Sequence, residues 1–92
     1  MYHTKNQQVT ALAPLAKDFK KPVQEVMIYG ILTADIPTPV YVRLYGSQGN
    51  GENILVDLDR MAISFSEEWE IARVEVELAS IINANVCLVW RE

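Results

Sequence analysis

The chain has 92 residues, of which 50% are hydrophobic and 22% are charged, and its formal net charge at pH 7 is −4. This length allows one domain with a modest core, and the composition is that of a folded globular protein rather than a disordered chain. No apolar run approaches the roughly 20 residues that a transmembrane helix needs, so no membrane partner is expected. The single cysteine, Cys87, excludes an internal disulfide, and we expect a cytoplasmic protein.

Charge is distributed unevenly along the chain. Residues 1–50 contain five Lys/Arg and three Asp/Glu, whereas residues 51–92 contain three Lys/Arg and nine Asp/Glu. Nucleic acids are bound by clustered cations that neutralise phosphate charges. The acidic second half therefore argues against nucleic acid as a ligand, and it is compatible with a protein partner that has a basic surface.

The first part of the chain is predicted to form a flexible tail and then a helix. Residues 1–8 are polar and form the expected tail, so that residues 9–92 make up a single globular domain. The helix is predicted from Thr10, which can cap it, to about Lys21, and Pro22 closes it. Its apolar residues fall at i, i+3, i+4 and i+7, the spacing of one helix face: Leu12, Leu15, Ala16 and Phe19.

The middle of the chain is predicted to form a three-stranded meander. Residues 23–33 are apolar on both faces and indicate an internal strand. After a proline-containing turn, residues 40–45 and 54–59 alternate between apolar and other side chains on either side of a glycine-containing loop, Gly46 to Asn53. The apolar residues of both segments must face one core, which predicts a hairpin. Its opposed pairs are expected to be Leu44 and Val56, Val42 and Leu58, and Arg43 and Asp57.

Residues 66–83 support two interpretations. The pattern Ser64-Phe-Ser-Glu67 resembles a capping box, and it favours a helix of this length. Residues 73–78 alternate strictly, as in a half-buried strand. We expect the helix and leave open whether residues 71–79 are helix or strand. With a last buried strand at 86–90, the prediction is an α+β domain of order α-β-β-β-α-β, with two helices and a mainly antiparallel four-stranded sheet.

The side chains best suited to contact another protein lie on one predicted strand and on the acidic segment that follows. Tyrosine and arginine alternate with the apolar residues of the strand, so they face away from the core. Both residue types are enriched at protein interfaces. The predicted partner-binding residues are therefore Tyr41, Arg43, Tyr45, Glu67, Glu68, Glu70, Glu75 and Glu77.

The sequence contains no complete catalytic or metal-binding set. His3 is the only histidine and lies in the expected tail, so no Cys–His or Ser–His–Asp arrangement can be assembled. We predict a small non-enzymatic protein without cofactor or metal, which acts as a regulatory adaptor, subunit or inhibitor by binding a protein partner. A homo-oligomer is compatible with this function. A second interpretation is an acidic inhibitor that mimics nucleic acid.

One short stretch resembles the minimal nucleotidyltransferases. Leu44–Ser47, then Gly51, then Asp57–Asp59 is similar to the hydrophobic-aromatic-Gly-Ser turn and the Asp-x-Asp strand of that family. The chain differs in having valine before the first aspartate, no basic residue in the loop, and no acid on the last strand. The resemblance implies an alternative function, in which Mg²⁺ and a nucleotide are bound by Gly46, Ser47, Asp57 and Asp59.

Overall fold

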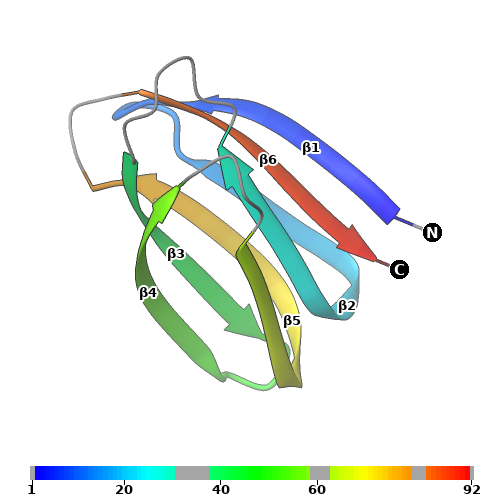
Figure 1. Ribbon diagram of the computed structural model, residues 1–92. Helices are drawn as coiled ribbons and strands as arrows, with labels where there is room; N and C mark the ends of the chain where they lie inside the picture. Colours follow the sequence, from blue (N-terminus) through cyan, green and yellow to red (C-terminus); the bar gives the residue numbers. More distant parts are fainter. Residues whose placement is uncertain (1, 31–37, 59–62, 80–82, 92) are drawn as a thin grey trace.

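The computed structural model of the chain is an all-β protein, and it describes residues 2–30, 38–58, 63–79 and 83–91 (Figure 1). The strands in these ranges form one antiparallel sheet in the order β1-β6-β2-β5-β3-β4, so β1 and β4 are the edge strands. Their bounds are β1 Tyr2–Val9, β2 Leu15–Gly30, β3 Thr38–Gly46, β4 Gly51–Leu58, β5 Ile63–Leu78 and β6 Ala84–Arg91.

The two longest strands, β2 and β5, bend and fold the sheet into two facing layers (Figure 1). Their pairing changes register between Asp18 and Val23 and again between Val23 and Glu25. Before the bend, β2 pairs with the second half of β5, whose other side carries β3 and then β4. After the bend, β2 lies between the first half of β5 and β6, with β1 beyond β6. Irregularities of this kind bend a strand and increase its twist, which brings the two layers together.

Alternate side chains fill the space between the layers. On β3, Val40, Val42 and Leu44 are fully buried, while the residues between them lie at the surface or are only partly buried. Strand geometry requires this period of two, and the β-branched side chains suit a pleated, half-buried surface. The other five strands all contribute buried residues that complete the core: Val9, Leu15, Phe19, Val23, Val26, Ile28, Leu58, Ile71, Val74, Val76, Ala84, Val86, Leu88 and Trp90.

The predicted α+β fold is wrong, because the described residues contain no helix. The segment predicted as the first helix forms a turn and then the first half of β2. Leu15 and Phe19 are buried as expected, but Leu12 is 97% exposed. A spacing of four residues returns to the same face in a strand as well as in a helix, so Leu15 and Phe19 satisfied both patterns. Accordingly, no helix in the described ranges is long and apolar enough to cross a membrane.

Residues 66–78 of the segment predicted as the second helix belong to β5, so residues 71–78 are strand, while residues 80–82 lie outside the described ranges. Val74 and Val76 are fully buried, whereas Glu75 and Glu77 pair with groups on the outer surface. The strict alternation was therefore the correct indicator. The capping pattern at residues 64–67 lies inside a strand and caps no helix.

Residues 2–8 of the expected flexible tail contribute most of β1, and residue 1 lies outside the described residues. This strand pairs with β6 along its whole length, from Tyr2 opposite Arg91 to Val9 opposite Ala84. The tail prediction rested on polar composition alone, and an edge strand tolerates polar residues because much of its surface faces solvent.

The strands predicted at 23–33, 40–45, 54–59 and 86–90 are confirmed as parts of β2, β3, β4 and β6, although residues 31–33 and 59 lie outside the described ranges. Their predicted arrangement as a meander is wrong, because β5 lies between β2 and β3. The cause is that residues 66–83 were assigned to a helix. A helix would have left β2 and β3 free to pair with each other.

The β3–β4 hairpin is confirmed, but its register differs from the prediction by four residues. Leu44 pairs with Glu52, and Arg43 pairs with Asn53 rather than with Asp57. The turn is shorter than predicted, because β4 already begins at Gly51. A shift of four residues, like any even shift, keeps every side chain on its face. The core side of the hairpin was therefore predicted correctly, while the predicted Arg43–Asp57 pair does not form.

Candidate functional site

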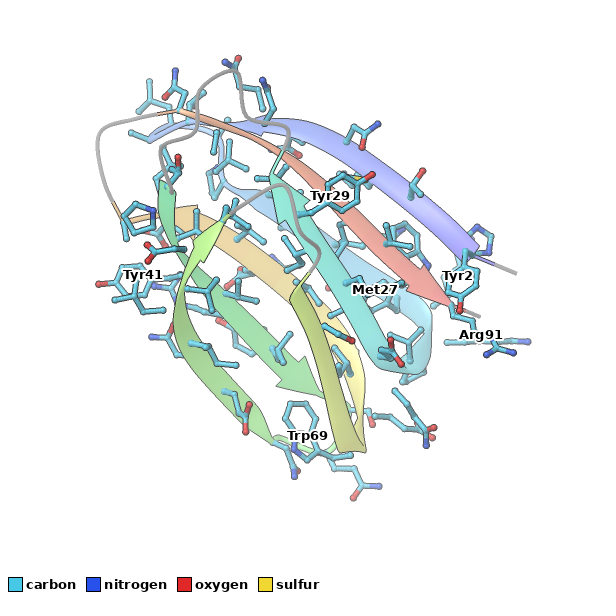
Figure 2. The ribbon with its side chains drawn as sticks, in the orientation of Figure 1. Tyr2, Met27, Tyr29, Tyr41, Trp69 and Arg91 are labelled. Atoms are coloured by element: carbon cyan, nitrogen blue, oxygen red, sulfur yellow. The ribbon has the colours of Figure 1, made fainter. Side chains whose placement is uncertain are left out.

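The outward side chains of β3 and its neighbours form a surface that we call the tyrosine face. The register places Leu55 of β4 directly opposite Tyr41, and it places Glu77 and Glu75 of β5 opposite Tyr41 and Arg43. Figure 2 shows Tyr41 projecting outward from the sheet. The tyrosine face is defined by Tyr41, Arg43, Tyr45, Leu55, Glu75 and Glu77.

The apolar members of the tyrosine face are well exposed. Leu55 is 60% exposed, Tyr45 is 40% exposed and Tyr41 is 36% exposed. Single exposed apolar residues are ordinary on a protein surface, but neighbouring ones on one face mark a site where another molecule can dock. Tyr41 and Leu55 are neighbours across a strand pair, so they form a continuous apolar strip.

Hydrogen bonds between strands hold the polar members of the tyrosine face. Arg43 Nη1 donates to Glu77 Oε2 over 2.5 Å, and the Tyr45 hydroxyl donates to Glu75 Oε1 over 2.8 Å. The Arg43 guanidinium also lies 5.7 Å from the centre of the Tyr41 ring, within the range of a cation–π contact. Carboxylates of β5 therefore hold both Arg43 and Tyr45, and Arg43 also contacts the Tyr41 ring.

Arg73 of β5 extends this network to β2. Its Nε and Nη2 donate to Glu75 Oε2 over 3.3 and 3.0 Å, and its Nη1 donates to Asp18 Oδ2 over 2.7 Å. Two arginines therefore alternate with the acidic residues across the face. The carboxylates of Glu75 and Glu77 are paired within the chain and do not form a continuous acidic surface.

The Tyr45–Glu75 hydrogen bond shifts the pKa of its two partners in opposite directions. It raises the pKa of Tyr45 above the usual 10.0, and together with Arg73 it lowers the pKa of Glu75 below the usual 4.5. Because the pKa of Glu75 is lower in the folded state, its contribution to stability is present above about pH 4.5 and is lost as the pH falls through the lowered pKa.

We expect Glu75→Gln to weaken the loss of stability at acid pH and to return the pKa of Tyr45 toward its usual value. Urea unfolding at several pH values measures the first effect, and an NMR titration of the Tyr45 ring measures the second. Glu52→Gln is the matched control, because Glu52 is an exposed carboxylate of β4 with no hydrogen-bond partner among the described residues. An identical Tyr45 titration in wild type and Glu75→Gln would contradict the hydrogen bond.

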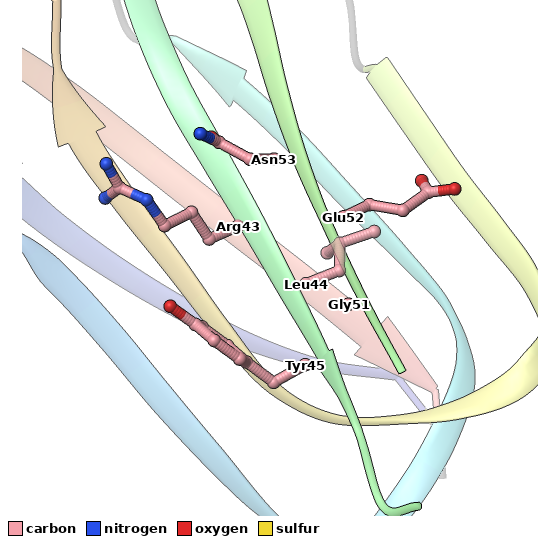
Figure 3. A pocket seen from close by; sticks show the side chains of 6 residues that line it. All are labelled: Arg43, Leu44, Tyr45, Gly51, Glu52 and Asn53. Atoms are coloured by element: carbon pink, nitrogen blue, oxygen red, sulfur yellow. The ribbon is translucent and has the colours of Figure 1, made fainter. Parts of the chain in front are cut away.

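A shallow hollow of about 250 Å³ lies beside the tyrosine face, between β3 and β4. Gly51 pairs with Tyr45, so the missing side chain leaves space next to the phenol ring. Figure 3 shows Arg43 and Tyr45 projecting to one side of the hairpin, while Leu44 and Glu52 project to the other. The hollow thus offers a guanidinium and a phenol as hydrogen-bonding groups.

The structure separates the predicted partner-binding residues into two sets. Glu70 is exposed at the β3–β4 turn, where its carbonyl accepts a hydrogen bond from the Ser47 amide over 3.3 Å. The side chains of Glu67 and Glu68 lie outside the described residues. The residues that come together are Tyr41, Arg43, Tyr45, Glu75 and Glu77.

Sequence reasoning did not select Leu55, Arg73 or Asp18. The outward orientation of Leu55 followed from the alternation of its strand, but its position beside Tyr41 depends on the exact hairpin register. Arg73 and Asp18 are 55 residues apart and meet only because β2 pairs with β5. Because both segments were predicted as helices, the pairing that brings Arg73 and Asp18 together could not be predicted.

The residues that resemble a nucleotidyltransferase signature are apart in the structure. Gly46 and Ser47 lie at the β3–β4 turn, whereas Asp57 lies near the opposite end of β4. At about 3.3 Å per residue, the distance along the strand from Gly51 to Asp57 is about 20 Å. Asp59 lies outside the described residues. Within the described part of the chain, no three His, Cys, Asp or Glu side chains are grouped to hold a metal ion.

The sequence matches no protein-family model, and a search of curated proteins finds no match. The function must therefore be inferred from the surface of the chain itself. The tyrosine face combines exposed apolar groups with ordered polar groups on neighbouring strands.

Proposed function

We propose that this protein is a small non-enzymatic interaction module that binds a protein partner through the tyrosine face. The observation that carries the proposal is the adjacent exposure of Tyr41 and Leu55 on paired strands, next to Arg43 and Tyr45. Tyrosine and arginine provide much of the binding energy at protein interfaces, because each combines a large contact area with a polar group. An adaptor, a subunit or an inhibitor would use such a surface in the same way.

The hydrogen bonds of the tyrosine face favour binding by ordering the side chains in advance. Arg43 is held by Glu77, and Tyr45 is held by Glu75. Immobilising a flexible side chain on association costs about 0.5–1.5 kcal/mol, and side chains that are already fixed avoid part of this cost. The sheet beneath them is rigid because β3 pairs on both sides, with β4 and with β5.

The fitting partner has an apolar patch for Tyr41 and Leu55, surrounded by hydrogen-bonding and basic groups. Asp57 and Glu70 are exposed near opposite ends of the β3–β4 hairpin, and neither carboxylate has an ionic partner among the described residues. Rim charges of this kind steer association and select partners more than they add affinity. A basic rim on the partner would complement both carboxylates.

The proposal is tested by capturing partners on the tagged protein from a lysate of its native host. Tyr41→Ala is expected to weaken binding of a stoichiometric protein partner by about 10-fold or more, since truncating a central aromatic residue costs at least about 1–2 kcal/mol. Titration of the purified partner against wild type and variant measures the change.

Leu12→Ala is the control, because Leu12 is also an exposed apolar residue but lies in the turn between β1 and β2. It should leave the affinity unchanged. A captured partner that binds the double variant Tyr41→Ala/Tyr45→Ala as tightly as wild type, with the fold intact by circular dichroism, would place its binding site elsewhere and overturn the proposal.

A further inference from the structure

The two edge strands of the sheet differ in how they are protected from pairing with another chain. On β1 the inward positions before Val9 are polar, with Lys5 and Gln7 half-buried, and Gln7 Nε2 donates to the carbonyls of Ala13 and Pro14 over 3.3 and 3.2 Å. An inward-pointing charge is one of the devices that block edge-to-edge pairing. On β4 the central residues are all apolar, from Ile54 to Val56, and Leu55 is 60% exposed.

The sequence of β4 is complementary to itself when two copies run antiparallel. If the two-fold axis that relates the two copies passes next to Leu55, Leu55 lies opposite Leu55 of the second copy. Ile54 then lies opposite Val56, and Asn53 lies opposite Asp57. Over residues 53–57, apolar residues then meet apolar residues and the polar pair can form a hydrogen bond. Glu52 falls opposite Leu58, and no two like charges are opposed. Moving the axis by one residue in either direction places Leu55 opposite Asn53 or Asp57 instead.

We propose that β4 is the dimer interface of this protein, with β4 of a second copy as its occupant. The pairing is isologous, as in most symmetric dimers, and joins the two sheets edge to edge. It brings the two copies of Leu55 side by side on the outer face, and it also covers the half-buried side chains of Ile54 and Val56, which pack against the core only in part. Within the described residues β4 pairs with β3 alone, so its second edge is available.

This dimer extends the proposed function, because it joins two tyrosine faces into one surface. Tyr41 lies opposite Leu55 on each copy, so both tyrosines would flank the paired leucines at the axis. A partner with two copies of its own binding patch would then be held bivalently. The β4 interface itself does not depend on the proposed function, since it rests on the pattern of β4 alone.

Sedimentation equilibrium of the full chain over a range of concentrations tests the dimer. The wild type is expected to show a reversible monomer–dimer equilibrium. Leu55→Glu is expected to sediment as a monomer wherever the wild type dimerises, because two carboxylates would be opposed at the axis. Leu12→Glu introduces the same charge at an exposed leucine away from β4 and should dimerise as the wild type does.

Cysteine crosslinking tests the register. Cβ atoms of directly opposed residues are about 4.5–5.5 Å apart, which is close enough for a disulfide after small adjustment, so Leu55→Cys should form a covalent dimer under mild oxidation. Asn53→Cys lies on the same strand face, but its two copies would be about 13 Å apart in this register and should not crosslink. The native Cys87 is only 2% exposed and serves as the background in both variants.

A monomeric wild type at every concentration, or a dimer that Leu55→Glu leaves intact, would overturn the β4 interface. Crosslinking of Asn53→Cys as readily as Leu55→Cys would overturn the register. Failure of the proposed function has a different signature, because Tyr41→Ala would then leave partner binding unchanged whether or not the protein dimerises.

Discussion

Trp90→Ala is expected to lower the free energy of unfolding by about 3–5 kcal/mol, the usual range for removing a buried large aromatic side chain. Trp90 on β6 is only 7% exposed. Its ring centroid lies 5.4 Å from that of Phe19 on β2 and 5.7 Å from that of His3 on β1, and the His3 ring is stacked on it. One side chain therefore connects three strands.

The position of Trp90 explains why its loss should be severe. Phe19 lies at the start of the bend in β2, directly after the paired residues Leu15–Asp18, whereas Trp90 pairs with Val26, which follows the bend. The indole thus fills space between the two layers, and Lys17 Nζ lies 5.0 Å from the ring centroid. Domains of this size are stable by about 5–15 kcal/mol, so the substitution would remove a large share of the total.

Urea unfolding followed by circular dichroism and by the fluorescence of Trp69, the one tryptophan left in the variant, measures this loss. Trp90→Phe is the control, because it keeps an aromatic ring in the same place and should lose clearly less stability. If Trp90→Ala costs under about 1 kcal/mol, the ring does not fill the interlayer core as described, because full burial of a side chain of this size is worth more.

The sequence predicts an element correctly where its apolar pattern fits the strand period of two and does not fit the helix period of 3.6, or the reverse. On β3, the alternation of Val40, Val42 and Leu44 with tyrosine and arginine fits only a strand, and its core face was predicted correctly. In the first half of β2, Leu15 and Phe19 fit a helix and a strand equally. There the helical pattern depended on Leu12 and Ala16, and Leu12 proved to be an exposed turn residue.

The candidate site could be predicted only within one strand. The outward orientation of Tyr41, Arg43 and Tyr45 follows from alternation, and it is confirmed by their exposure and their partners. The partners themselves depend on strand order, which places β5 between β2 and β3. Local sequence does not encode strand order, because it is decided by how the whole set of strands buries a common core.

Gly46→Ala is expected to lower the free energy of unfolding by about 1–3 kcal/mol, the usual cost of overpacking a site that is already filled. A Cβ atom at Gly46 would lie 2.8 Å from Cε3 of Trp69 and 3.1 Å from Cβ of Asn50. The Trp69 indole packs against the core at the end of the sheet next to the β3–β4 turn (Figure 2). The Gly46 amide also closes the turn by donating to the Asn50 carbonyl over 2.6 Å.

A double-mutant cycle separates this steric cause from a general effect on the turn. In a Trp69→Leu background the ring carbon nearest to position 46 is gone, so Gly46→Ala should cost clearly less than it does in the wild type. Gly51→Ala is the matched control at the other end of the turn, because the nearest atom to its Cβ would be the Leu44 carbonyl oxygen at 3.3 Å. An equal cost for Gly46→Ala in both backgrounds would mean that the backbone of the turn, and not the indole, requires glycine at this position. The β3–β4 hairpin would then be positioned by its own turn geometry rather than by the contact between Gly46 and Trp69 of β5.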